Sequence, residues 1–147
     1  MFERKQLSIL EKRVKEKRRF IQVIMGPRQV GKTTLVTQLL KKSKSAHQFI
    51  SADGIAAHSH SWLEQNWQGV RAQCDKHKAK DFLFVIDEIQ KIENWSETIK
   101  RLWDEDTRKG YNVKLILLGS SRLLLQKGLT ESLAGRFETI YLGHWSF

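Results

Sequence analysis

The segment GPRQVGKTT at residues 26–34 sets two glycines, a lysine and two threonines directly after the apolar run FIQVIM at 20–25. Glycines allow the backbone to curve closely around a phosphate, with several N–H groups pointing inward. A helix that begins near Lys32 would add its positive dipole end. Lys32 would then reach the β- and γ-phosphates, and the Thr33 hydroxyl would bind Mg²⁺. The residues expected to hold the nucleotide are Gly26, Pro27, Arg28, Gln29, Val30, Gly31, Lys32, Thr33 and, as a support of the loop, Thr34.

Two carboxylates follow the apolar run FLFVI at residues 82–86. Asp87 at the end of a strand could hold the hydration shell of Mg²⁺, as the second metal residue beside Thr33. The adjacent Glu88 could polarise a water for in-line attack on the γ-phosphate. A small-molecule kinase has less need of this second carboxylate, because its substrate brings the nucleophile. The pair therefore favours hydrolysis, although a strand-end acid that caps the next helix is the alternative for Glu88.

A third polar group ends the run LILLGSS at residues 115–121. In P-loop ATPases with an additional strand between the phosphate-loop strand and the acidic strand, a polar residue at its tip reports on the γ-phosphate. Ser120 or Ser121 could take this role, or either could simply form a turn. Arg136 could stabilise charge on a transferring phosphoryl group, in cis or from a neighbouring subunit, or form an ordinary surface ion pair.

Alternating apolar strands and amphipathic helices must position these groups. The sequence predicts strands at 20–25, 47–52, 81–88, 113–119 and 137–142, and helices at 3–19, 33–42, 60–78 and 92–105. Such alternation is typical of an α/β fold with a central, mostly parallel five-stranded sheet flanked by helices. Parallel sheets bind ligands at the carboxyl ends of their strands, where every polar motif above falls.

The composition suits one compact domain of 147 residues, with one cysteine and a net charge of +10. Eight Lys/Arg against three Glu lie in the first twenty residues, which resemble a basic amphipathic helix with Leu7, Leu10 and Val14 on one side. This charge could be a solvated helix face, a contact surface for nucleic-acid phosphates, or a surface for an acidic partner. Without a secretory h-region or a bilayer-length apolar run, we expect a cytoplasmic protein with no membrane contact.

The ordered motifs GPRQVGKTTL, FVIDEIQKIENW, LLGSSRLLL and SLAGRFETIYLGHWSF resemble the AAA-type ATPase domain of a prokaryotic family that carries a C-terminal domain of unknown function. The resemblance spans roughly residues 19–147 and implies a three-layer P-loop NTPase fold of the ASCE class, with ATP and Mg²⁺ as cofactors. It places Gln90 and Trp95 in the segment after the acidic pair, Asp87 and Glu88, and makes Arg136 a better candidate for a catalytic role. Family members often have threonine where this chain has Leu118, so the sensor role passes to Ser120 or Ser121.

The resemblance also shapes the expected organisation and function. We expect residues 1–19 to form the basic N-terminal helix and 20–147 the ATPase core, without the C-terminal lid and further domain of the relatives. The leading hypothesis is Mg²⁺-dependent ATP hydrolysis coupled to a conformational change. The alternative is a nucleotide-gated switch with little turnover that contacts nucleic acid through the basic helix. Self-association would decide whether Arg136 acts in cis or in trans.

Overall fold

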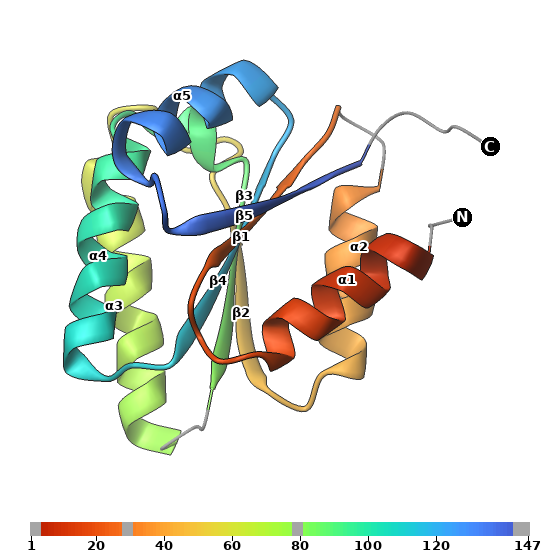
Figure 1. Ribbon diagram of the computed structural model, residues 1–147. Helices are drawn as coiled ribbons and strands as arrows, with labels where there is room; N and C mark the ends of the chain where they lie inside the picture. Colours follow the sequence, from red (N-terminus) through yellow and green to blue (C-terminus); the bar gives the residue numbers. More distant parts are fainter. Residues whose placement is uncertain (1–3, 28–30, 78–80, 143–147) are drawn as a thin grey trace.

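The computed structural model describes residues 4–27, 31–77 and 81–142. Within these ranges a parallel sheet lies between two layers of helices, with α1 and α2 on one face and α3, α4 and α5 on the other (Figure 1). The helices are α1 (Arg4–Lys15), α2 (Lys32–Lys42), α3 (His60–His77), α4 (Trp95–Lys109) and α5 (Arg122–Ser132), with a short 3-10 turn, η1 (Ile89–Lys91). The strands are β1 (Ile21–Met25), β2 (Ala46–Ser51), β3 (Phe82–Asp87), β4 (Val113–Gly119) and β5 (Phe137–Tyr141). The helices within these ranges are too short or too polar to span a bilayer.

The strand order is β2-β3-β4-β1-β5, and every neighbouring pair is parallel. Strand β4 therefore lies between the phosphate-loop strand β1 and the acidic strand β3, where the additional strand was expected. Met25 pairs with Gly119, and Asp87 pairs with Leu118. The predicted three-layer α/β fold is confirmed, and its register brings the ends of three strands to one edge of the sheet.

Two hydrophobic clusters hold the layers together, one on each face of the sheet. The larger cluster packs β-strand side chains against α3, α4 and α5, with Trp67, Trp95 and Trp103 all buried. The second cluster contains Leu7 and Leu10 of α1 together with side chains of α2, the sheet and the chain after β5. Helix α1 is thus part of the same packed core rather than a separate appendage.

Element boundaries differ from the expected ones at α1, which ends at Lys15 rather than at residue 19, and around α4 and α5. Helix α4 begins only at Trp95, because Asn94 before it takes a left-handed conformation with φ 56°, and Gly110 ends it with φ 81°. Helix α5 was not predicted from the sequence. Leu123 and Leu124 in its first turn are 79% and 49% exposed, so its apolar residues do not mark a single buried side.

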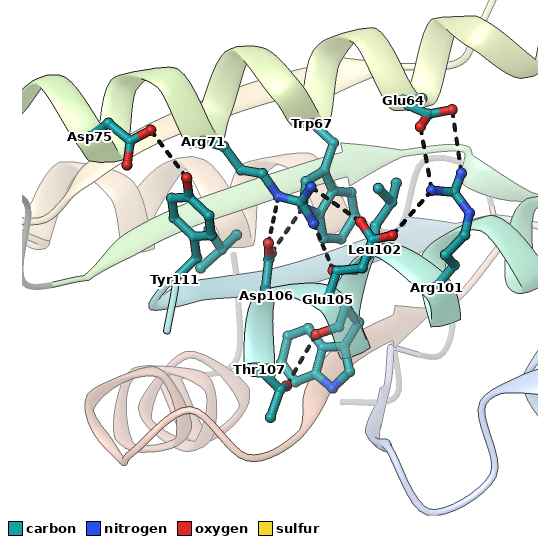
Figure 2. Close-up of polar contacts among 12 residues, drawn as sticks. Glu64, Trp67, Arg71, Asp75, Arg101, Leu102, Glu105, Asp106, Thr107 and Tyr111 are labelled. Atoms are coloured by element: carbon teal, nitrogen blue, oxygen red, sulfur yellow. Dashed lines mark hydrogen bonds and ion pairs between the residues drawn. The ribbon is translucent and has the colours of Figure 1, made fainter. Parts of the chain in front are cut away.

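A buried ion-pair network joins α3 to α4 (Figure 2). Nε of Arg71 donates to Asp106 Oδ1 at 2.6 Å, and the indole of Trp67 donates to Asp106 Oδ2 at 2.9 Å. Arg71 also donates to the Leu102 carbonyl at 3.0 Å and to Glu105 at 3.2 Å. Arg71 is 4% exposed and Asp106 is fully buried, so each charge depends on the other for compensation.

Replacing Arg71 by Met should lower the free energy of unfolding by about 3–5 kcal/mol, because it leaves the Asp106 carboxylate buried without its ion-pair partner. The Arg71→Met/Asp106→Asn double variant removes both charges and keeps an acceptor for Trp67, so it should recover at least half of that loss. Urea denaturation measures both values. As a control, Arg101→Met removes the exposed pair with Glu64 and a 3.6 Å pair with Glu105, and should cost less than about 1 kcal/mol. Strictly additive losses in the double variant would contradict this account.

Candidate functional site

The predicted phosphate loop, residues 26–34, follows β1 after Met25 and leads into α2, which begins at Lys32. Gly31 precedes the helix with φ 89°, a backbone conformation that residues other than glycine rarely adopt. The second glycine of the motif is therefore needed for this turn. Thr33 and Thr34 lie exposed in the first turn of α2. Arg28, Gln29 and Val30 lie outside the described residues. The described part of the loop therefore presents hydroxyls and a helix N-terminus at the edge of the sheet, an arrangement suited to phosphates.

The ammonium of Lys32 folds back on its own loop. Nζ donates to the carbonyl oxygens of Gly26 at 2.6 Å and Pro27 at 2.9 Å, and the residue is only 7% exposed. Gly26 in turn donates its N–H to the Gly119 carbonyl at 3.4 Å, which ties the loop to the end of β4. The lysine charge is thus fixed at the mouth of the loop, next to where β4 ends.

The acidic pair ends β3 beside this loop. Glu88 takes a left-handed backbone conformation with φ 55°, is 7% exposed, and donates its N–H to the Leu118 carbonyl at 2.8 Å. Because of this turn, Glu88 departs from the strand direction immediately after Asp87. A left-handed conformation is unusual for a residue with a side chain, and such strain concentrates at functional sites.

Two side chains hold the Glu88 carboxylate. Ser120 Oγ donates to Glu88 Oε2 at 2.9 Å, and Gln90 Nε2 donates to the same oxygen at 2.7 Å. Of the two sensor candidates, Ser120 contacts the acidic pair. Ser121 caps α5 by accepting from the Leu124 N–H at 3.4 Å. The structure thus brings Lys32, Glu88 and Ser120 to one edge of the sheet.

Asp87 is half-buried and lies near one negative charge, that of Glu88, and one positive charge, that of Lys32. Burial raises the pKa of Asp87 above its ordinary value, the neighbouring Glu88 charge raises it further, and the Lys32 charge opposes both. A cation near the two carboxylates would relieve this repulsion. Among the described residues no group of three or more His, Cys, Asp or Glu side chains could hold a metal. Mg²⁺ needs no such group, because it binds through one or two carboxylates, substrate phosphates and water.

Arg136 lies away from these groups. Its carbonyl accepts from the N–H of Ile21, which places it beside the start of β1, roughly 13 Å of strand from Met25. Its guanidinium donates to both carboxylate oxygens of Asp104 on α4, at 2.9 and 3.0 Å. The geometry therefore corresponds to the ion-pair alternative and does not bring Arg136 to the phosphate loop of its own chain.

Two contributors to the site were not found by sequence reasoning alone. Gln90 entered only as part of a family segment, although its position two residues after a strand-end glutamate was visible. Gly119 gave no signal at all beyond ending an apolar strand. A Cβ atom there would lie 2.6 Å from Gln90 Oε1 and 2.4 Å from Leu125 Cδ1, a clash that only the folded structure reveals.

Replacing Lys32 by Met should weaken binding of ATP about 10- to 100-fold, because a charged hydrogen-bond donor to phosphate is lost. Isothermal titration calorimetry with ATP and Mg²⁺ measures the change. Lys42→Met is the matched control, since Lys42 is an exposed lysine at the other end of α2. Equal affinities of the two variants for ATP would contradict the assignment of this loop to phosphate.

Comparisons with known proteins agree with this geometry. The model of a family described as an AAA domain matches residues 18–147. An uncharacterized protein of Haemophilus influenzae is 29% identical over 133 residues, which cover 87% of this chain and 32% of the relative. An uncharacterized protein of Methanocaldococcus jannaschii is 32% identical over 117 residues, covering 79% of this chain and 24% of the relative. The chain thus spans only about a third or a quarter of the relatives it matches. The chain belongs to this family of AAA domains, with a nucleotide-binding, P-loop ATPase-like fold.

Proposed function

We propose that this domain hydrolyses ATP in a Mg²⁺-dependent reaction whose energy drives a conformational change. The observation that carries the proposal is the Glu88 carboxylate, held by Ser120 beside the phosphate loop that contains Lys32. A carboxylate in this place can accept a proton from water as the water attacks the γ-phosphate. A domain that only bound nucleotide would have no need of such a base.

The remaining groups have distinct roles in the proposed reaction. Lys32 exchanges its bonds to the loop carbonyls for bonds to the phosphates and offsets their charge. Thr33 and Asp87 would hold Mg²⁺ through their side-chain oxygens, and the ion would supply positive charge against the phosphates. Ser120 keeps the Glu88 carboxylate at the sheet edge. Arg136 could contribute only from another subunit, because its own chain engages it with Asp104.

Replacing Glu88 by Gln should lower the rate of ATP turnover about 100-fold or more while ATP affinity stays within about threefold, because only the proton acceptor is lost. Phosphate release and calorimetric binding, each with ATP and Mg²⁺, measure the two quantities. Glu97→Gln is the matched control, since Glu97 is an exposed glutamate on α4. Chelation of Mg²⁺ with EDTA should abolish turnover in every variant.

The same experiment separates the proposal from its alternative. Tight ATP binding without measurable turnover in the unsubstituted protein would favour a nucleotide-gated switch. Turnover that survives Glu88→Gln would show that another group is the base.

A second candidate function rests on the exposed charge of α1 and the end of α2. Because Leu7, Leu10 and Val14 are buried, the basic side of α1 faces solvent. Together with α2 it borders a cavity of about 400 Å³ whose lining includes Lys15, Lys42 and Lys44, with Glu11 and Asp81 as the acidic members. Nucleic-acid phosphates would suit this surface, consistent with a nucleotide-gated switch. The exposed cations are Lys5, Lys12, Lys15, Lys17, Arg19, Lys41, Lys42 and Lys44.

If this surface binds nucleic acid, replacing Lys5, Lys12 and Lys15 by Gln should weaken binding to a labelled duplex. It should also make the dependence on salt shallower, because fewer counterions are released. Fluorescence anisotropy at 50–200 mM salt measures both effects. The control replaces Lys76, Lys100 and Lys109 by Gln, which removes the same charge from exposed positions on α3 and α4. Equal effects of the two triple variants would reject a contact through α1.

A further inference from the structure

We propose that Gln90 is a positioning residue for the reaction, which holds the Glu88 carboxylate in the orientation needed to accept a proton from water. This inference rests on the proposed hydrolysis and adds to it a residue that acts through Glu88 rather than on the nucleotide. It is carried by three observations: a short bond between the two side chains, an unpartnered buried oxygen on Gln90, and a glycine that makes room for the amide.

The first observation is the geometry at the carboxylate. Gln90 Nε2 donates to Glu88 Oε2 at 2.7 Å, and Ser120 Oγ donates to the same oxygen at 2.9 Å. The two donors come from different elements: Gln90 lies in η1, and Ser120 directly follows β4. Two donors fix an orientation that a single donor leaves free to rotate. Both bonds fall on Oε2, so neither occupies Oε1, the oxygen that remains to accept a proton.

The second observation is that the Gln90 amide is only half satisfied. Gln90 is 9% exposed, and its Oε1 is buried without a hydrogen-bond partner among the described residues. A buried acceptor without a partner destabilises a fold, and an apolar side chain of similar length would avoid this cost. The amide also cannot be reversed, since that would set its oxygen against the carboxylate. Gln90 is therefore poorly explained by stability and well explained by its bond to Glu88.

The third observation is the seat of the amide at the end of β4. A Cβ atom on residue 119 would lie 2.6 Å from Gln90 Oε1. Backbone at this point is also fixed from the other side, because the Gly119 carbonyl accepts from Gly26 of the phosphate loop. Only glycine leaves the amide enough room between the strand and Leu125. The position of the carboxylate thus depends on Gly119 through Gln90.

Replacing Gln90 by Met tests the proposal. We expect kcat for ATP to fall about 10- to 100-fold, as expected when a catalytic group is misplaced, while KM and ATP affinity stay within about threefold. The melting temperature should change little, because removal of the unpartnered oxygen offsets part of the lost bond to Glu88, and Ser120 still donates to that carboxylate. A large loss of turnover with little loss of stability and unchanged KM is what a merely structural role would not give. Gln73→Met on α3 is the matched control for the same substitution away from the site.

Gly119→Ala provides a second way to displace the Glu88 carboxylate, because the added methyl group would push the Gln90 amide out of place. It should lower kcat to a similar extent as Gln90→Met, and the double variant should be no slower than the slower single variant, because both act through one bond. A double-mutant cycle of Glu88→Met and Gln90→Met, followed by urea denaturation without nucleotide, should show non-additive stabilities, because methionine at position 88 offers no oxygen to the Gln90 amide.

The outcomes distinguish this proposal from the proposed function. If Glu88→Gln abolishes turnover and Gln90→Met leaves kcat unchanged, the base is right and the positioning role is overturned. Additive stabilities in the cycle would also overturn it, since the two side chains would then not be coupled. If the unsubstituted protein does not hydrolyse ATP, the proposed function fails and the catalytic role of Gln90 fails with it.

Discussion

Hydrogen bonding between β1, β4 and β3 sets where each of these three strands ends. Met25 lies opposite Gly119, and Asp87 lies opposite Leu118, so the next residues along each strand emerge side by side. A slip of one residue in either pairing would turn the side chains of a strand to the opposite face of the sheet. The phosphate loop, the acidic pair and Ser120 come together only because this register is held. Its strength comes from the apolar side chains of all three strands, which are buried on both faces.

Charges near the core are compensated within the chain. Cations that lie in or near the core are engaged with oxygens of the chain itself. Arg71 is bound to Asp106, Arg136 to Asp104, and Arg18 to the Val113 and Trp103 carbonyls. Burial lowers the pKa of Arg18 to about 10, and Asp106 and Asp104 oppose this shift. The net charge is +10, and the positive charges that remain exposed to solvent are carried mainly by lysines rather than by arginines.

The sequence predicted the strands well, because they rest on local signals. Apolar runs of five to seven residues mark strands buried on both faces, and the glycine-lysine spacing marks the loop. The predicted strand at 137–142 already placed Arg136 at the start of a strand, but its ion pair with Asp104 on α4 could not be read from the sequence, because the two residues are 32 positions apart. The role of Gln90 was missed for a similar reason. Its partner Glu88 is two residues away in the sequence, but the space for the Gln90 amide depends on Gly119 at the end of β4. Helix α5 was missed because its first turn exposes leucines.

Helix α1 has a consequence for where this domain can be divided. The family match begins at residue 18, after α1 has ended at Lys15. Yet Leu7, Leu10 and Val14 of α1 cover α2, the helix that follows directly from the phosphate loop, and Lys114 on β4 donates to the Val14 carbonyl at 2.6 Å. A boundary drawn at the start of the family match would therefore cut through a hydrophobic core. It would open to water the sides of α2 and of the sheet that α1 packs against, so the limits of the family match and of the folding unit do not coincide.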